Sequence, residues 1–191
     1  KRFLFRSDQG GNEIWHIYVQ NEDGSTQDLT PGENARSLFS GWAFHEKSFY
    51  YTSNKRNPKF MDVYEMDIQS FESKIIFQND GALNYADVSN DGRFLALSKT
   101  HTRDNSDMYL YNVKSGELKL LSSHVGNINH SPAGFSVDSK SLYFLTDQDS
   151  EFNFLKRYNI PSGEIVTIQK EDWDIWYNYF SHTGRYRVTG I

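Results

Sequence analysis

The stretch Val88–Leu121, VSNDGRFLALSKTHTRDNSDMYLYNVKSGELKLL, holds one copy of a unit that recurs along the chain. Its turns are SNDGR (Ser89–Arg93) and KSGE (Lys114–Glu117), in which Asn, Asp and Gly supply positive φ at little cost. Around the turns, the segments FLALS, MYLYNV and LKLL mix apolar, aromatic and polar residues as strands do. The stretch therefore predicts three strands, and it requires neighbours because one such unit cannot bury its own apolar faces.

Two landmarks repeat with nearly the same period. The turn-and-strand pattern starts at Phe44, Val88, Phe135 and Phe180, with spacings of 44, 47 and 45 residues. A strand-like segment before a second turn ends at Val19, Ile68, Val113 and Ile160, with spacings of 49, 45 and 47 residues. The unit has about four strands in about 45 residues, which is the period of a β-propeller blade and unlike that of helical repeats. We predict an all-β chain of four-stranded antiparallel blades.

The period also predicts the blade boundaries. We expect blades at about 1–39, 40–87, 88–133 and 134–179, with the start of a further blade at 180–191. Both ends of the chain align with the second strand of a blade, so we expect an arc of a larger ring, with about six to eight blades, rather than a closed four-bladed ring. Open sheet edges invite pairing, and the sequence therefore also predicts a homo-oligomer through exposed blade edges.

Composition limits the partners. The chain has 20 basic and 25 acidic residues and a formal charge of −5, with no polybasic stretch, so we expect neither nucleic acid nor a membrane surface as a partner. No apolar run approaches the roughly 20 residues that span a bilayer, which predicts a soluble chain. The absence of cysteine excludes a disulfide framework and a thiolate site, and it leaves cytoplasmic, periplasmic and secreted locations open. No cofactor is expected.

Antiparallel alternation sorts the connections into two groups. The turns between first and second strands are short and similar, and they share an end of the sheet with the turns between third and fourth strands. The opposite end carries the connections between second and third strands, at 6–13, 53–61, 99–107 and 146–153, together with the interblade links. Because recognition usually resides on loops held by a rigid scaffold, we expect partners at this long-loop end. The alternative is that these loops are solvated connections.

The candidate peptide- or partner-binding residues lie in these loops, and they are Glu13, Arg56, His101, Arg103, Asp104, Asp149 and Glu151. Ionised side chains are candidates because they make the stronger hydrogen bonds. His124 and His130 lie in a link at the same predicted end as His101, so a polar cluster could form there. We favour the alternative, in which these side chains are dispersed and solvated.

Other motifs give no catalytic or metal site. No serine has glycine at both −2 and +2, so the nucleophile elbow of an acyl-transfer enzyme is missing from these residues. Asp147, Asp149 and Glu151 alternate as calcium ligands do, but Phe152 stands where a calcium loop needs glycine, and we predict no metal. Trp173 and Trp176 could stack on a ligand, although packing between blades is favoured.

Four segments carry a family resemblance: SDQGGNEIWHIYVQNEDGSTQDLT, SNKRNPKFMDVYEMDI, VSNDGRFLALS and FSHTGRYRVTGI. Together they resemble the propeller of bacterial serine peptidases of the prolyl-oligopeptidase family, especially the acylaminoacyl-peptidase-like and dipeptidyl-peptidase-like branches. The SNDGR-type opening is shared with WD40-like repeats of TolB-like propellers. Two turns depart from the pattern, since FHEKS lacks Asp-Gly and SVDSK has Ser139 in place of glycine.

The resemblance implies that a separate α/β-hydrolase domain carries a Ser-Asp-His triad and that the propeller limits the access of peptides to it. The parent protein would be a serine peptidase, this chain would hold no catalytic residue, and its partners would be the peptide substrate and the hydrolase domain. The competing hypothesis is a non-enzymatic TolB-like scaffold for protein–protein interaction. A propeller lyase or glycosidase is a third reading, which would need several carboxylates or histidines converging at the propeller axis.

Overall fold

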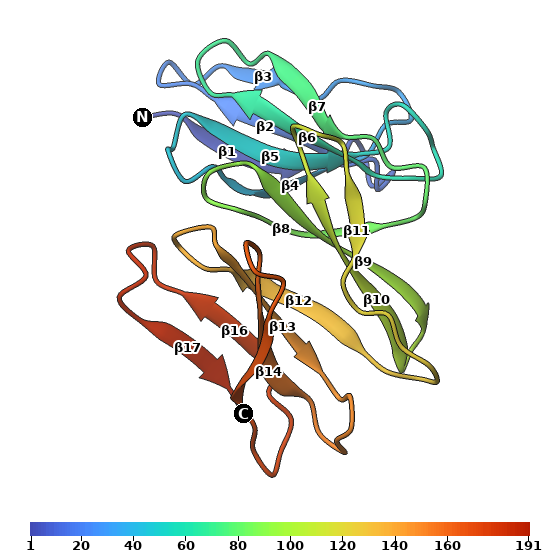
Figure 1. Cartoon of the computed structure of the whole chain (residues 1–191). Helices are drawn as coiled ribbons and strands as arrows, with labels where there is room; N and C mark the ends of the chain where they lie inside the picture. The colour runs from blue at the N-terminus through green and yellow to red at the C-terminus, as the bar shows by residue number, and fades with distance from the viewer. The chain divides into compact units, whose positions relative to one another are not determined.

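A computed structural model describes all 191 residues, which form 17 strands and no helix. The chain divides into two compact units, Lys1–Leu83 and Asn84–Ile191, and each is described here by itself. In Figure 1 the first unit runs from blue to green and the second from green to red. The structure contains no helix of the length and apolarity that crossing a membrane requires.

The first unit holds two antiparallel sheets. The three-stranded sheet has the order β1-β2-β3, with bounds β1 Phe3–Ser7, β2 His16–Gln20 and β3 Thr26–Asp28. The four-stranded sheet has the order β4-β5-β6-β7, with bounds β4 Ser37–Trp42, β5 Ser48–Ser53, β6 Asp62–Asp67 and β7 Ser73–Phe77. Strands that follow each other in sequence are therefore neighbours in space, as in a propeller blade.

The second unit repeats this meander. One four-stranded sheet consists of β8 Asn84–Val88, β9 Phe94–Thr102, β10 Asn105–Asn112 and β11 Leu118–Leu120. The next consists of β12 His130–Phe135, β13 Ser141–Thr146, β14 Phe154–Asn159 and β15 Ile165–Gln169. A two-stranded sheet pairs β16 Tyr177–Phe180 with β17 Arg187–Gly190. The predicted all-β fold with four-stranded antiparallel blades is confirmed.

Two details differ from the sequence-based expectation. The boundaries predicted at 40, 88, 134 and 180 fall within or at the end of the first strands β4, β8, β12 and β16, so each sheet begins a few residues earlier than expected. First strands are hard to recognise because they are short and irregular: β12 contains Pro132 and Gly134, and its pairing with β13 has a register shift between Pro132 and Phe135. In addition, the expected long loop 99–107 is wrong, since β9 and β10 extend through it and leave only a two-residue turn.

The core lies between sheets and is formed by the middle strands. Phe49, Tyr51 and Met66 of the second sheet pack with Ile17 and Val19 of the first, and all are at most 5% exposed. In the second unit, Met108 and Ala96 of one sheet pack with Leu142 and Phe144 of the next. Every residue of β5 is buried, on both faces of its sheet. A strand that is covered on both faces of its sheet has a nearly continuous run of apolar residues. The middle strands show this pattern in the sequence.

The turn between first and second strands keeps one backbone geometry when its sequence changes. One residue of the turn has a positive φ in every copy: 58° at Glu46, 68° at Gly92, 59° at Ser139 and 70° at Gly184. The turns FHEKS and SVDSK, which lack the usual glycine, therefore adopt the glycine conformation. A non-glycine residue in this region costs about 1 kcal/mol of backbone strain.

Replacing Glu46 with glycine is expected to stabilise the fold. Glu46 is exposed and has φ 58°, so Glu46→Gly removes strain without removing a core contact. The free energy of unfolding in urea should rise by about 0.5 kcal/mol, because the flexibility that glycine adds to the unfolded chain offsets part of the gain. Glu46→Ala keeps the Cβ and is the control. An equal gain in the alanine variant would assign the effect to the lost charge.

Candidate functional site at the long-loop ends of the sheets

The connections between second and third strands meet the interblade links within each unit. In the first unit, the backbone N–H of Ser37 donates to Trp15 O at 2.7 Å. In the second, the N–H of Ile175 donates to Asn153 O at 2.9 Å, and the N–H of Asn153 donates to Asp174 Oδ1 at 2.8 Å. These contacts place the connections between second and third strands beside the interblade links, as the sequence predicts. We call this end of each sheet its long-loop end.

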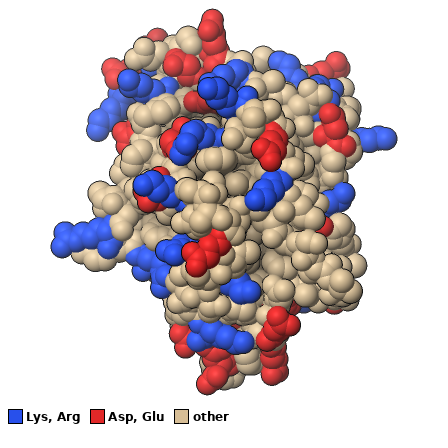
Figure 2. Space-filling model, viewed as in Figure 1, with Lys and Arg blue, Asp and Glu red and all other residues tan.

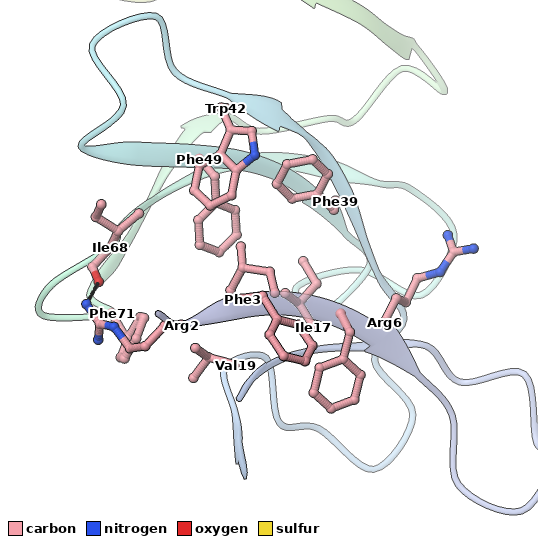
Figure 3. A pocket seen from close by; sticks show the side chains of 12 residues that line it. Arg2, Phe3, Arg6, Ile17, Val19, Phe39, Trp42, Phe49, Ile68 and Phe71 are labelled. Atoms are coloured by element: carbon pink, nitrogen blue, oxygen red, sulfur yellow. Dashed lines mark hydrogen bonds between the residues drawn. The ribbon is translucent and has the colours of Figure 1, made fainter. Parts of the chain in front are cut away.

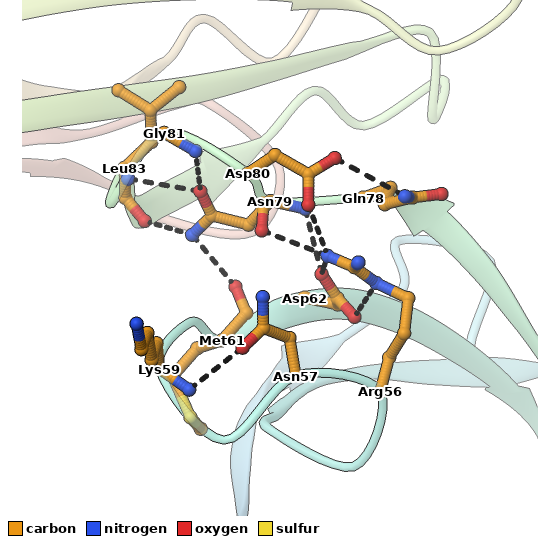
Figure 4. A network of polar contacts seen from close by, with 10 residues as sticks. All are labelled: Arg56, Asn57, Lys59, Met61, Asp62, Gln78, Asn79, Asp80, Gly81 and Leu83. Atoms are coloured by element: carbon orange, nitrogen blue, oxygen red, sulfur yellow. Dashed lines mark hydrogen bonds and ion pairs between the residues drawn. The ribbon is translucent and has the colours of Figure 1, made fainter.

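Arg56 is the most strongly held of the candidate residues. Its Nε and Nη2 donate to the two carboxylate oxygens of Asp62 at 2.8 and 2.9 Å, and Nη2 also donates to Asn79 O and Asp80 Oδ1 (Figure 4). The Asp62 side chain is fully buried. The hydrogen bonds to Asp62 raise the pKa of Arg56 above its usual value. Because this guanidinium is committed to protein partners, we interpret Arg56 as a residue that fixes the 54–61 loop rather than as a peptide contact.

Asn79 completes this network from the link. Its Nδ2 donates to Met61 O and Leu83 O, and its Oδ1 accepts from the N–H groups of Gly81 and Leu83. Asn79 is 1% exposed, and all these groups are satisfied by one side chain. Loop and link are thus joined by a buried polar connection, which gives a rigid rather than an adaptable end to the second sheet.

A histidine cluster forms in the second unit around Asp107. His101 Nε2 lies 2.8 Å from Asp107 Oδ2, and His124 Nδ1 lies 3.7 Å from Asp107 Oδ1. The His124 and His130 ring centroids are 5.1 Å apart. The expectation of dispersed side chains is therefore wrong here, because the β9–β10 hairpin brings position 101 beside position 107 and the following link brings His124 to the same carboxylate. Partial burial raises the pKa of Asp107, but hydrogen bonds from His101 and Ser122 hold it below its usual value.

The other candidate residues lie in turns and loops. Arg103 and Asp104 form the turn of the β9–β10 hairpin, where Asp104 accepts from Thr102 Oγ1 at 2.7 Å and from Asn127 Nδ2 at 3.1 Å. Glu13 (φ 59°) and Asp149 (φ 58°) take left-handed backbone conformations, and Glu151 is exposed. Glu13 and Arg56 belong to the first unit and the other five to the second.

Sequence reasoning missed the residues that organise these sites. Asp62 and Asn79 bind Arg56, and Asp107 gathers the histidines. Asp107 has a weak signal in hindsight, since it pairs with Lys99 in the β9–β10 hairpin and His101 lies two residues further along, at the β-bulge. Asp62 has no such signal, because in the sequence it is an ordinary residue at the start of a strand. On the face shown in Figure 2, acidic and basic side chains are interspersed, without a broad field of one sign.

His130 is expected to make the second unit sensitive to acid. It is 4% exposed and its Nδ1 has no hydrogen-bond partner. Burial, reinforced by His124 and Lys156 and opposed by Asp147, lowers its pKa below 6.5. The unfolded chain therefore binds the proton more readily, and this contribution to stability is present above pH 6.5 and lost as the pH falls below it.

His130→Phe tests this expectation. The variant should lose less stability than the parent chain between about pH 7 and about pH 5, as measured by urea unfolding. Phe keeps an aromatic ring beside Phe144, whose ring centroid lies 6.1 Å from that of His130. Asp107 has a lowered pKa and titrates below this window. Equal pH dependence in the variant and the parent chain would show that another group carries the effect.

The antiparallel four-stranded meanders define the class: the fold is a β-propeller fold built of WD40-like blades. No protein-family model matches the chain. The chain is 23% identical over 171 residues to dipeptidyl aminopeptidase BIII of Pseudoxanthomonas mexicana, covering 88% of this chain and 25% of that protein. It is 31% identical over 149 residues to the Tol-Pal system protein TolB of Wolinella succinogenes, covering 77% and 34%.

Solved structures show the same fold. TolB from Acinetobacter baumannii matches 98% of this chain and 46% of its own with a TM-score of 0.69 at 16% identity. A prolyl endopeptidase structure matches 94% and 36% with a TM-score of 0.56 at 12% identity. The chain spans about a quarter to a third of the length of the curated relatives it matches. It thus resembles the propellers of both serine peptidases and TolB.

Proposed function

We propose that this chain is the propeller of a serine oligopeptidase and that it selects peptides for a separate α/β-hydrolase domain. The observation that carries the proposal is the similarity to a dipeptidyl aminopeptidase, which extends over 88% of the chain. The nucleophile elbow is not among these residues, so the proposal assigns the chain no step of bond cleavage. The chain would hold or exclude substrate through its loops, which a rigid scaffold supports. The hydrogen bonds between these loops and the interblade links would fix the positions at which side chains can contact a peptide.

A fluorophosphonate probe tests this function on the full-length polypeptide that contains the chain. The polypeptide should be labelled at one serine outside residues 1–191, and the chain alone should stay unlabelled. A matched pair of full-length variants then tests selection: deletion of residues 148–151 in the 147–153 loop should change the preference for peptide length, whereas Glu46→Gly at the opposite end of a sheet should not. An unlabelled full-length polypeptide would contradict the proposal.

A non-enzymatic scaffold is the second candidate. It is supported by the 31% identity to TolB and by the TM-score of 0.69 to a TolB structure. In this case the long-loop ends hold another protein, and homo-oligomers through exposed blade edges would be a separate association. The expected result is one stoichiometric protein partner for a full-length polypeptide that fluorophosphonate does not label. Loss of that partner in a variant lacking residues 148–151 would place the contact at the long-loop end.

A further inference from the structure

Two connections meet at the long-loop end of the fourth sheet. The loop 147–153 joins β13 to β14, and the link 170–176 joins β15 to β16. Asn153 holds them together, because its backbone N–H and its Nδ2 donate to Asp174 Oδ1 at 2.8 and 3.0 Å. Ile175 anchors the link, since it is 1% exposed and belongs to the core of the second unit. The surface that loop and link form is therefore fixed at several points.

An aromatic pair lies beside this connection. Phe152 of the loop and Trp173 of the link have ring centroids 6.0 Å apart, with an angle of 36° between the ring planes. Phe152 is half-buried, whereas Trp173 is 70% exposed, so this tryptophan does not pack between sheets. The lysine of the link, Lys170, lies over the Phe154 ring instead, 4.9 Å from its centroid. The indole of Trp173 is thus left open to a ligand.

Carboxylates flank the aromatic pair in the sequence. The loop and the link together contain six acidic side chains and one lysine. Three of the six accept hydrogen bonds within the chain, and these are Asp147, Glu171 and Asp174. The other three are exposed and have no hydrogen bond or ion pair within the chain, and these are Asp149, Glu151 and Asp172. Glu151 directly precedes Phe152 and Asp172 directly precedes Trp173, so each ring has a free carboxylate next to it in the chain.

An open aromatic ring between free carboxylates suits an organic cation. The face of an aromatic ring attracts a cation, most strongly in tryptophan, and carboxylates add charge-assisted hydrogen bonds. A guanidinium group uses both, because it is planar and carries five N–H donors. A metal ion fits less well, since the structure contains no group of three or more His, Asp or Glu side chains placed to hold one.

The chain already contains guanidinium groups in this kind of contact. Arg93 lies over the Phe94 ring, 5.3 Å from its centroid, and its Nε donates to Asp91 Oδ2 at 2.6 Å. Arg2 lies over the Phe71 ring at the same distance (Figure 3). A ring and a carboxylate therefore hold an arginine within this fold, and the aromatic pair of the fourth sheet offers the same groups without an arginine.

We propose that the long-loop end of the fourth sheet binds an arginine side chain of a peptide. The guanidinium lies over the Trp173 ring, and the carboxylates of Glu151 and Asp172 accept its hydrogen bonds. Phe152 supports the indole from the loop. The inference rests on the proposed function in taking the ligand to be a peptide, and it names the side chain by which the propeller selects that peptide.

The probe is a short peptide of glycine and serine with a central arginine, acetylated and amidated at its ends so that the side chain carries its only charge. We expect a saturable shift of the Trp173 indole resonance in nitrogen–proton NMR spectra of the chain, assigned by its loss in Trp173→Leu. The peptide with citrulline, a neutral group of the same shape, should bind about tenfold or more weakly. The peptide with lysine should bind about threefold more weakly, because an ammonium group cannot stack.

Matched variants locate the site, with binding followed through the amide resonances of the loop. Trp173→Leu, Glu151→Gln and Asp172→Asn should each weaken binding by about threefold to tenfold. Trp176→Leu replaces a second tryptophan of the link, which is 72% exposed, and Glu164→Gln removes an equal charge from the turn between β14 and β15. Both of these controls should bind the peptide like the parent chain.

Equal affinities of the arginine and citrulline peptides would overturn the proposal. The absence of a saturable shift at Trp173 would do the same, and so would equal losses in the site variants and the controls. An arginine-free peptide with a free amino terminus that binds as tightly would also overturn it, by assigning the site to a terminal ammonium group. The peptidase function fails separately, because its test is fluorophosphonate labelling of the full-length polypeptide, whereas these measurements use the chain alone.

Discussion

Asp62→Ala should lower the free energy of unfolding of this chain by about 3 to 5 kcal/mol. The Asp62 carboxylate is fully buried and accepts hydrogen bonds from Arg56 Nε and Nη2 and from the backbone N–H of Asn79. Removing it leaves the buried N–H without a partner and the guanidinium without its main counter-charge. Urea unfolding followed by circular dichroism measures the loss.

Asp80→Ala is the matched control for this variant. Asp80 binds the same Nη2 at 2.9 Å, but its side chain is 63% exposed, so water can replace it. An exposed ion pair contributes less than about 1 kcal/mol, and the control should lose no more than that. Similar losses in the two variants would mean that the charge of Asp62, rather than its burial and its hydrogen bonds, determines the effect.

The network also links stability to the candidate loop site. Arg56 connects the 54–61 loop to the 78–83 link through Asp62, Asn79 and Asp80. A variant that breaks this connection is expected to change partner binding by releasing the loop, without any contact between Arg56 and the partner. Arg56→Lys separates these roles, because lysine keeps the charge and cannot make the bidentate contact.

The sequence predicted the fold because the turns carry a local signal. In SNDGR, Ser89 Oγ donates to Asp91 and accepts from the N–H of Phe94, while Gly92 takes φ 68°. All these contacts lie within six residues, so the repeat is visible wherever the turn recurs. At Glu46 and Ser139 the sequence signal weakened but the geometry did not, because the paired strands on either side impose the backbone conformation.

The sites were less predictable because they depend on pairing between distant segments. Asp107 meets His101 at the β-bulge of the β9–β10 hairpin and His124 through the next link. The predicted blade boundaries fell a few residues late for a related reason. β8 (NYADV) and β12 (HSPAGF) have weak apolar patterns and become strands by pairing with the apolar β9 and β13. Neither the register nor this pairing can be read from a local stretch.

Phe49→Ala should destabilise the first unit by about 3 to 5 kcal/mol, which is the usual cost of removing a buried phenylalanine ring. Phe49 is 0% exposed and packs with Ile17 and Val19 of the first sheet as well as with Met66 of its own. Its loss therefore leaves a cavity between two sheets that cannot close without moving one of them. Urea unfolding measures this loss, with the fluorescence of Trp15 and Trp42 reporting on the first unit.

Phe49→Leu controls for the size of the cavity. Leucine fills most of the space, so this variant should lose about 1 kcal/mol. Comparable losses for alanine and leucine would assign the effect to ring contacts with Phe39 and Trp42 rather than to the cavity.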